Sequence, residues 1–387
     1  MVTPNGVIGS ARHGHGYGKS KSQVKTVSML FCLLLIFMVS PVCGAESRTV
    51  LVGVYYYPGF DSTHTGTPDY PDRKNWSWPL TQDEPYKGIY NSTDTDMIKQ
   101  HIAWFEDLTI DFVILSWWGK NSYTDNCSKI MFETFLENAT FTKLCIMVEP
   151  FNGTESDDRY DFTAVYNYIY STFYEPYEGL YFHFVGGYGN VKPLILFFNA
   201  DNFTSSNVFE RDNRFTVKIS GHHNYAEWIY NHYDAFPWNE WIKHNYQLPQ
   251  CRCFPVSPRY DNHYLGRGTD YRVDITYEKN TYTSQWNEAL THAKDNAIDV
   301  VTICSWNEYN ERTQIEPHHD HDAFDPDPFY LYNITKQYIQ QLKETESSEV
   351  SEEIWWQDPL VLSVILIGIA FGIAFGIHLM ARDKEKK

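Results

Sequence analysis

The sequence predicts an α/β protein whose main part is a (β/α)8 TIM barrel, with a single transmembrane helix near the C-terminus. Three observations lead to this prediction. Short apolar runs alternate with helix-like segments across residues 46–345 of the 387-residue chain. These runs are apolar at nearly every position, as parallel strands buried on both faces are. About eight such units fit the length of one barrel.

Each expected element follows from its own pattern. Strands are expected at Val50–Tyr57, Phe112–Trp117, Leu144–Glu149, Pro193–Phe198, Phe215–Ile219, Asp234–Trp238, Cys253–Val256 and Val300–Trp306. Helices are expected at Asp94–Leu108, Cys127–Asn138, Asp161–Phe173, Thr281–Asn296 and Pro328–Lys343. In the first helix Met97, Ile102 and Phe105 fall on one side, as in an amphipathic helix. A doubly wound open sheet is the alternative, but the sequence has neither GxGxxG nor GxxxxGK[ST] to support a nucleotide site.

Both ends of the chain carry an apolar stretch. In residues 1–45 a basic lead precedes an apolar run and Cys43-Gly44-Ala45, which predicts a signal peptide or, alternatively, an uncleaved signal anchor. Segment 359–380 is long and apolar enough to span a bilayer, and the tail 381–387 is basic. Basic flanks belong on the cytosolic side. We therefore expect a single-pass membrane protein with its barrel lumenal or extracellular, in the Golgi, elsewhere in the secretory pathway, or at the cell surface.

Two further patterns accompany the membrane segment. The acidic stretch 346–358 is expected to form a flexible stalk between the barrel and the membrane. Within the span, Gly368, Gly372 and Gly376 form two overlapping GxxxG patterns, which would allow a dimer through a second helix.

Sequons agree with the predicted lumenal or extracellular placement, and the cysteines are odd in number. N-x-S/T sequons begin at Asn75, Asn91, Asn126, Asn138, Asn152, Asn202 and Asn333. Outside the signal region the cysteines are Cys127, Cys145, Cys251, Cys253 and Cys304. This odd number requires a free thiol or an intermolecular bridge. Cys145 and Cys304 lie in apolar runs and are interpreted as core residues.

Composition narrows the class of ligand. The charge of −18 and the pI near 5.2 argue against a nucleic-acid partner, because an acidic surface repels phosphate. Hydrophobic residues make up 43% of the chain, so a large core can form. Aromatic residues reach 17%. These aromatic residues either pack in the core or stack on sugar rings, and composition alone does not distinguish the two roles.

Carboxylates and aromatic residues gather where strands are expected to end. In a barrel the chemistry lies at the carboxyl ends of the strands. Candidate substrate-binding residues at these ends are Glu149, Tyr56, Tyr57, Trp117, Trp118, Tyr260, Trp306 and Asn307. The combination is typical of an oligosaccharide site.

Glu308 and Glu311 are the candidate catalytic pair. Three residues apart, their Cβ atoms lie about 5–6 Å from each other if the turn is helical. Glycoside cleavage needs one protonated and one ionised carboxyl group, and two close carboxylates separate their pKa values by repulsion. Solvated glutamates at a helix start are the alternative interpretation.

No metal or other cofactor is expected. His318, His319, Asp320, His321 and Asp322 form a cluster that could bind a cation. Consecutive residues rarely converge on one ion, however, and Pro317 and Pro326 mark a loop.

The motifs together resemble a known family. The run Ser305–Pro317 (SWNEYNERTQIEP) is similar to the strand-eight motif N-E-x-x-E-G-T-Q-I-E of the glycoside hydrolase family 99 endo-α-mannosidases. Weaker matches follow in the same order over about residues 50–345. Tyr55–Tyr57 resembles the first-strand aromatic motif, ILSWW (Ile114–Trp118) the S-W-Y segment, VEPF (Val148–Phe151) the I-E-P-Y segment and PRYD (Pro258–Asp261) the P-G-Y segment.

This resemblance implies a barrel that cleaves internal α-mannosidic bonds with retention and without a metal. It implies that Glu308 is a base on the sugar 2-hydroxyl, which gives a 1,2-anhydro intermediate. It implies further that Glu311 is the acid/base on the leaving oxygen and that Glu149 contacts the reacting sugar.

The sequence departs from the family pattern at several positions. Arg312 stands where the family has glycine, and a cation beside Glu311 would lower the pKa of that acid. Tyr309-Asn310 replaces Trp-His, Asn199 replaces an aspartate, and Asn75-Trp76-Ser77-Trp78 replaces a His-Trp segment.

Three functions remain open on the sequence. The first is a membrane-anchored endo-acting α-mannosidase. The second is a glycan-assembly enzyme, because the W-N-E-x-x-E pattern also resembles a glycosyltransferase-like sister group of polysaccharide biosynthesis. The third is a non-catalytic glycan-binding ectodomain.

Overall fold

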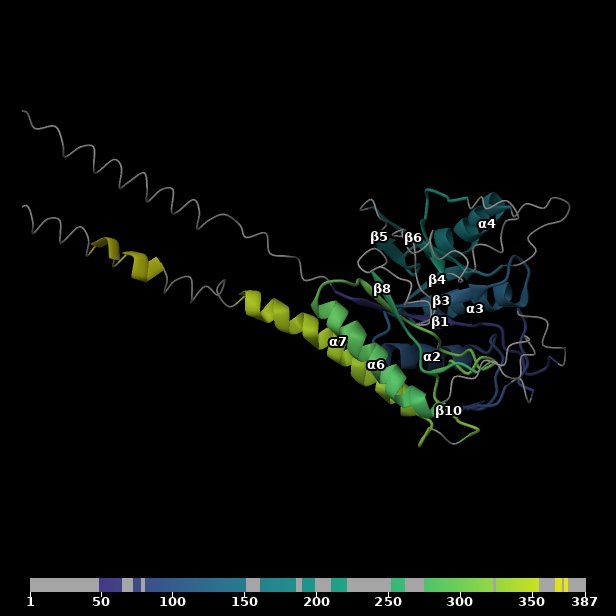
Figure 1. Cartoon of the computed structure of the whole chain (residues 1–387). Coiled ribbons are helices and arrows are strands. Elements are labelled where there is room, and N and C mark those ends of the chain that lie inside the picture. The colour runs from purple at the N-terminus through teal and green to yellow at the C-terminus, as the bar shows by residue number, and fades with distance from the viewer. Residues whose placement is uncertain are drawn as a thin grey trace, which may run out of the picture. The chain divides into compact units, whose positions relative to one another are not determined.

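The computed structural model describes most of one compact unit, Ser47–Lys387 (Figure 1). The described residues are 49–64, 72–77, 81–150, 161–185, 190–198, 210–220, 252–261, 275–322, 325–354, 366–370 and 372–374. The predicted signal segment 1–45, the predicted strand Asp234–Trp238 and most of the predicted span 359–380 lie outside them. Within these ranges, no helix combines the length and the apolar character that crossing a membrane requires.

A sheet of parallel strands forms the core. Its order is β7 (Thr216–Ser220), β6 (Val191–Phe198), β4 (Lys143–Val148), β3 (Phe112–Trp117), β1 (Leu51–Tyr56), β9 (Val300–Ile303) and β8 (Cys253–Val256). Every neighbouring pair in this order is parallel. The short β5 (His183–Val185) pairs antiparallel with β6. The first strand therefore lies between the second of the chain's parallel strands and its last, as the alternating apolar runs predict.

β1 pairs with one strand from early in the sequence and with one from late in it. Gly53 pairs with Phe112 of β3 on one side and with Thr302 of β9 on the other. A Cβ at Gly53 would lie 2.4 Å from the Phe112 ring, so only glycine fits here. The Phe112 ring is itself stacked on Phe182 at 3.9 Å between centroids. The close strand contact thus depends on the missing side chain.

The sheet curves strongly. Tyr55 of β1 meets Ser220 at the end of β7, with 3.2 Å between the two hydroxyl oxygens. β6, β4 and β3 separate these two strands in the sheet. A flat sheet would hold their side chains far apart, because neighbouring strands are spaced about 4.8 Å. The side of the sheet on which Tyr55 and Ser220 meet is therefore concave, and the Tyr55 side chain points into it.

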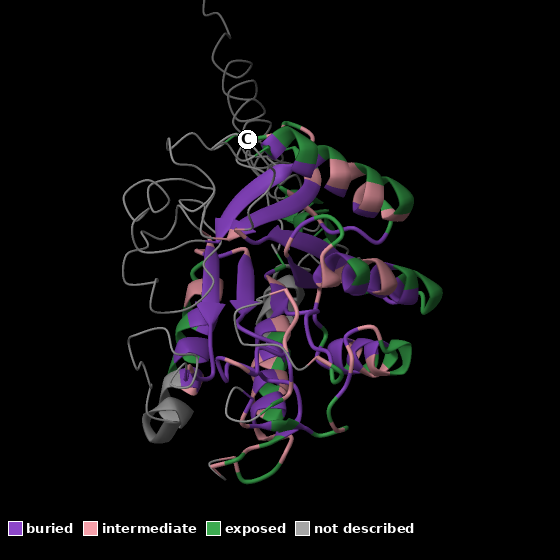
Figure 2. Cartoon of the chain, turned by 90° about the vertical axis from the view of Figure 1, so that its right-hand side faces the viewer, coloured by how far each residue is buried: buried purple, intermediate pink, exposed green. Residues whose placement is uncertain are grey.

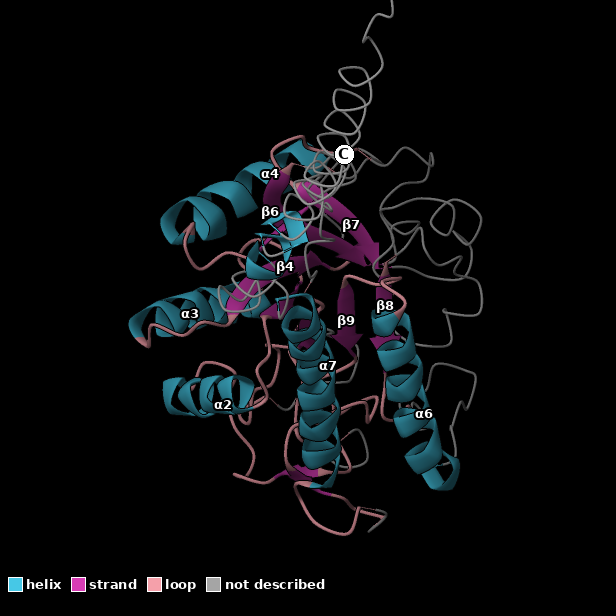
Figure 3. Ribbon diagram, turned by 90° about the vertical axis from the view of Figure 1, so that its left-hand side faces the viewer, coloured by secondary structure: helices cyan, strands magenta, loops and turns pink. Residues whose placement is uncertain are grey.

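Helices cover the convex side. They are α2 (Thr95–Asp107), α3 (Tyr123–Glu137), α4 (Phe162–Ile169) with η1 (Tyr170–Tyr174) and η2 (Glu175–Tyr177), α6 (Ile275–Lys294) and α7 (Tyr330–Ile354). Figures 2 and 3 show the strands buried and the helices arranged around them with their outer faces exposed. The side chain of Asp94 caps α2 by accepting from the N–H groups of Asp96 and Met97.

Most element bounds agree with the sequence prediction to within a few residues. The last strand is shorter than expected, ending at Ile303 instead of Trp306. The chain there turns into a loop in which Ser305 donates its N–H to the Thr313 carbonyl at 2.9 Å. α7 continues through the first part of the predicted stalk 346–358, up to Ile354. Glutamates, good helix formers, are frequent in this stretch.

The structure also places the modification and thiol positions that it describes. Among the sequons, Asn126, Asn138 and Asn333 are exposed, Asn91 is half-buried, Asn75 is buried, and Asn152 and Asn202 lie outside the described residues. Cys127, Cys145, Cys253 and Cys304 are buried, and Cys145 and Cys304 are confirmed as core residues. Burial raises the pKa of the Cys145 thiol well above its ordinary value.

Candidate active site

Three buried carboxylates follow two strands of the sheet. Glu149 comes directly after β4, and Glu308 and Glu311 lie in the loop after β9. Their exposed fractions are 4%, 3% and 8%. Carboxyl ends of parallel strands meet at one edge of a sheet, so the structure brings the predicted catalytic pair and Glu149 to one place.

The electrostatics of Glu149 show how close these groups are. Burial raises its pKa to about 7, against the lowering effects of a hydrogen bond from Ser116 and the charge of Lys74. The charges of Glu308 and Glu311 raise it further. The Ser116 hydroxyl donates to Glu149 Oε1 at 2.7 Å. Glu149 therefore carries a proton at mildly acidic pH.

Replacing Glu149 by Gln should remove a pH-dependent loss of stability. The folded pKa of about 7 lies above the ordinary 4.5, so the folded chain binds more protons than the unfolded chain between these values. The free energy of unfolding therefore falls by about 3 kcal/mol as pH rises through this window. Glutamine mimics the protonated acid and escapes this loss. Urea unfolding at pH 5 and pH 8 measures it, with the exposed Glu137→Gln as control; a wild-type difference retained in Glu149→Gln contradicts the assignment.

The loop after β9 holds the pair by its own hydrogen bonds. The Glu308 N–H donates to Ser305 Oγ at 2.9 Å, and the Asn310 N–H donates to Glu308 Oε1 at 3.2 Å. The Glu311 carbonyl accepts from the Asp261 N–H, beyond β8, at 2.8 Å. Both glutamates are therefore fixed at the backbone and are not solvated residues at a helix start.

Lys74 is a site residue that the sequence analysis did not identify. Its ammonium group forms an ion pair with Glu308 and lies 4.7 Å from the centre of the Tyr57 ring. It belongs to the segment between β1 and α2. No local pattern distinguishes it from its neighbour Arg73, which pairs instead with Asp61.

The other predicted contact residues divide into two groups. Tyr57 at the end of β1 faces the carboxylates, whose charges act on its hydroxyl. Trp118 and Tyr260 follow β3 and β8 and are half-buried. Tyr56, Trp117 and Trp306, in contrast, are buried in the helix layer, against His101, Tyr168 and Phe105 respectively. Strand alternation explains this: Tyr55 and Ser116 point to the concave side, so Tyr56 and Trp117 point away from it.

Asn307 belongs to a buried series of hydrogen bonds next to the carboxylates. Its side-chain oxygen accepts from the Tyr57 N–H at 2.8 Å, and its amide nitrogen donates to the Tyr90 hydroxyl at 3.1 Å. The Tyr90 hydroxyl in turn donates to Glu316 at 2.9 Å. A ring nitrogen of His101 lies 3.0 Å from the other Glu316 oxygen. Asn307 and Glu316 thus tie the loop after β9 to β1 and α2.

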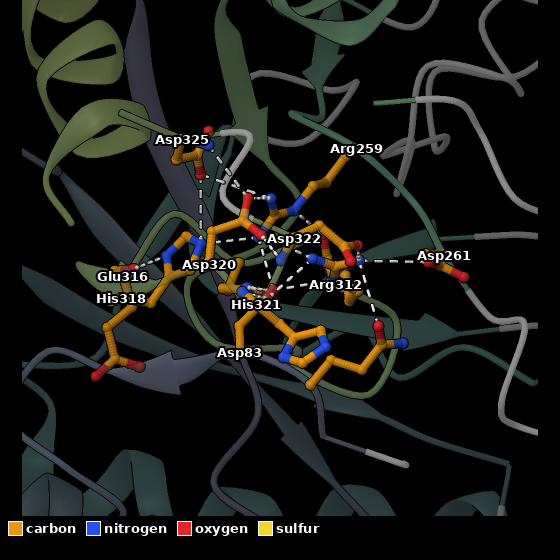
Figure 4. A network of polar contacts seen from close by, with 12 residues as sticks. Asp83, Arg259, Asp261, Arg312, Glu316, His318, Asp320, His321, Asp322 and Asp325 are labelled. Carbon is orange, nitrogen blue, oxygen red and sulfur yellow. Dashed lines mark hydrogen bonds and ion pairs between the residues drawn. The ribbon is translucent and has the colours of Figure 1, made fainter. Parts of the chain in front are cut away.

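Arg312 lies in a buried network of carboxylates. Its guanidinium group contacts Asp83 at 2.9 Å, Asp320 at 3.0 Å and Asp322 at 2.8 Å (Figure 4). The charge beside Glu311 is therefore not a bare cation, because carboxylates surround it. Burial would raise the pKa of Asp83, but Arg259 and Arg312 outweigh it and hold that pKa well below its usual range.

The histidine and aspartate cluster serves this same network. Asp320 contacts Arg259 at 3.0 Å, and a His318 ring nitrogen lies 2.7 Å from an Arg259 nitrogen. The strands β2 (Glu84–Pro85) and β10 (His318–His319) pair next to it. Among the described residues, no group of three or more His, Cys, Asp or Glu side chains is arranged to hold a metal ion.

The fold of this chain, a curved parallel sheet with helices on its convex side, can be compared with solved structures. Two solved structures of the GH99 endo-α-mannosidase from Bacteroides thetaiotaomicron are similar to this chain. One has a TM-score of 0.53 and 18% identity, and covers 76% of this chain and 98% of its own. The other, in complex with bis-tris propane, has a TM-score of 0.52, 18% identity and coverages of 78% and 99%.

A glycoside hydrolase-like protein also resembles the chain, at a TM-score of 0.48 and 15% identity, over 79% of this chain and 97% of its own. No protein-family model and no curated protein matches the chain. The resemblance that the motifs predict is thus confirmed as a similarity of fold.

Proposed function

We propose that the protein is a membrane-anchored, retaining, endo-acting glycoside hydrolase that cleaves internal α-mannosidic bonds of glycans. The observation that carries the proposal is the convergence of Glu149, Glu308 and Glu311 at one end of a curved parallel sheet. We propose further that the sheet closes as a (β/α)8 barrel, with the predicted Asp234–Trp238 as the sixth strand in chain order, between β7 and β8.

The proposed mechanism uses the two glutamates after β9 in different protonation states. Glu308, paired with Lys74, takes the proton of the sugar 2-hydroxyl. The freed oxygen forms a bond to the anomeric carbon while the glycosidic bond breaks, and Glu311 gives its proton to the leaving oxygen. Water then opens the 1,2-anhydro sugar, with Glu311 taking a proton from water and Glu308 returning one to O2. Two inversions at the anomeric carbon give net retention.

The location of the protein is part of the same proposal. A signal segment in 1–45, a span at 359–380 and a basic cytosolic tail at 381–387 would hold the barrel on the lumenal or extracellular side. The exposed sequons at Asn126, Asn138 and Asn333 would be available for glycosylation there. A dimer through the glycine pattern of the span is compatible with this topology.

Incubation of the full chain with α-linked manno-oligosaccharides and high-mannose glycans tests the proposal. We expect release of a di- or oligosaccharide with the α configuration at its new reducing end, identified by mass and NMR. The control is the double variant Glu308→Gln/Glu311→Gln, which should release none.

Other outcomes would favour the alternative functions. Glycan binding without any product from the wild type would support a non-catalytic ectodomain. Sugar transfer that depends on a nucleotide- or lipid-linked donor would support a glycan-assembly enzyme.

A further inference from the structure

Lys74 is held rigidly at the candidate site by its backbone. Its N–H donates to the Gly59 carbonyl at 2.7 Å, and its carbonyl accepts from the Asp61 N–H at 2.9 Å. These bonds fasten the segment 72–77 to the chain just after β1. The Lys74 side chain is only 14% exposed, and it pairs with the Glu308 side chain, which is 4% exposed.

The ammonium group lies among aromatic faces as well as carboxylates. It is 4.7 Å from the Tyr57 ring centre and 5.7 Å from that of Phe60. Both rings attract a cation through their π faces and keep water from it. The charge of Lys74 therefore acts on Glu308 in partly water-excluded surroundings, where ion pairs are stronger than at a surface.

The titratable groups around Glu308 come from several elements. They are Lys74 from the β1–α2 segment, Tyr57 from the end of β1, Glu149 from the end of β4, and Cys304 and Glu311 from the β9 loop. Three carboxyl groups this close cannot all be ionised without strong repulsion. Among the described residues, the cation of Lys74 favours the charged form of the carboxyl group with which it pairs.

Geometry directs that cation to Glu308. Lys74 forms its ion pair with this residue, whereas Glu149 accepts a hydrogen bond from the neutral Ser116. The raised pKa of Glu149 agrees with this division of charge. Arg73, the adjacent cation, is 43% exposed and pairs with Asp61. Its charge is therefore balanced by Asp61 and not by Glu308.

We propose that Lys74 is a positioning residue that holds Glu308 in its carboxylate form and thereby leaves the proton to the other two carboxyl groups. The assignment of charge stands on the ion pair. Its consequence for catalysis rests on the proposed function, in which Glu308 must be ionised to accept the proton of the sugar 2-hydroxyl.

The first test measures thermal unfolding of the full chain and needs no turnover. In Lys74→Met, Glu308 would be buried without its counter-charge, so the folded state would bind a proton that the unfolded state releases above about pH 4.3. Stability relative to the wild type should then fall as pH rises. We expect Tm to fall by about 5 °C more at pH 8 than at pH 5.

Three further variants separate charge from packing. Lys74→Arg should restore the wild-type pH dependence. Lys74→Met/Glu308→Gln should lose most of the pH-dependent part of the Tm difference, because glutamine cannot ionise, and the charge of Lys74 on Glu149 accounts for the remainder. Lys99→Met removes an exposed lysine that pairs with Asp96 at 3.3 Å, and should show no pH-dependent difference. A Tm difference between Lys74→Met and the wild type that is the same at both pH values overturns the proposal. So does a pH dependence of that difference that persists undiminished in the double variant.

The second test follows kcat/KM against pH. In Lys74→Met the acidic limb should move to higher pH, because Glu308 gains a proton more easily, and Lys74→Arg should keep the wild-type limb. An unchanged limb in Lys74→Met overturns the catalytic consequence. If the wild type cleaves no α-mannoside, the proposed function fails, while the unfolding test still decides the role of Lys74.

Discussion

Glu311→Gln should lower kcat/KM on a mannoside with an unactivated sugar leaving group about 10³-fold, within the range of a lost general acid. Glutamine keeps the shape of the side chain but has no proton to give to the leaving oxygen. The loop that carries Glu311 is fixed through the Asp261 N–H and through the loop's own hydrogen bonds. The substitution should therefore alter the chemistry without moving the backbone.

The leaving group separates the roles of the two glutamates. An α-mannosyl fluoride needs little protonation to depart, so Glu311→Gln should keep most of its activity on the fluoride. Glu308→Gln should lose activity on both substrates, because the 2-hydroxyl is no longer activated.

Steady-state kinetics on matched di-mannoside and fluoride substrates measure this difference, with thermal unfolding to confirm that both variants are folded. Equal losses on the two substrates in Glu311→Gln would contradict its role as the acid. Full activity of Glu308→Gln on the fluoride would contradict its role as the base.

The sheet could be predicted because its signal is local. Strands buried on both faces require continuous apolar runs, and Phe112–Trp117 and Cys253–Val256 have the predicted bounds. The same property explains the less accurate part of the site. When both faces of a strand are apolar, the sequence does not tell which residues point to the concave side. The sequence therefore groups Tyr56 and Trp117 with Tyr57 and Trp118, although the side chains of Tyr56 and Trp117 point to the opposite face of the sheet.

Long polar side chains are a different problem, since their partners are distant in the chain. Lys74 pairs with Glu308 across 234 positions, and Arg312 pairs with Asp83 across 229. Their spacing in the sequence gives no sign of either contact. The carboxylates were predictable because each follows a recognisable strand, which fixes its position without knowledge of its partners.

Arg312→Met should destabilise the protein by about 3–5 kcal/mol, the usual cost of removing one partner from a buried ion pair. Arg312 is fully buried, and its guanidinium group bridges Asp83 in the segment after β1 to Asp320 in the segment after β10. Without it, Asp83 and Asp320 would keep Arg259 as their arginine partner among the described residues, with contacts of 2.8 and 3.0 Å.

Arg312→Gly, compared with Arg312→Met, separates the effect of the backbone conformation on stability from the effect of the lost ion pairs. Arg312 has φ of 54°, in the left-handed region where glycine is favoured. Both variants lose the ion pairs, but glycine should be the less destabilising by about 1 kcal/mol, because it adopts this conformation without strain. This order is the reverse of the one expected in a helix or strand, where glycine is the poorer residue.

Chemical denaturation at pH 7 measures both losses, with Lys336→Met as the matched control. Lys336 pairs with Asp107 at 2.6 Å, but the two side chains are 32% and 47% exposed. Its loss should cost no more than about 1 kcal/mol. If Arg312→Met costs as little as this control, the buried network does not stabilise the fold. A large loss in Arg312→Met would instead assign to Arg312 the joining of the segments that carry Asp83 and Asp320.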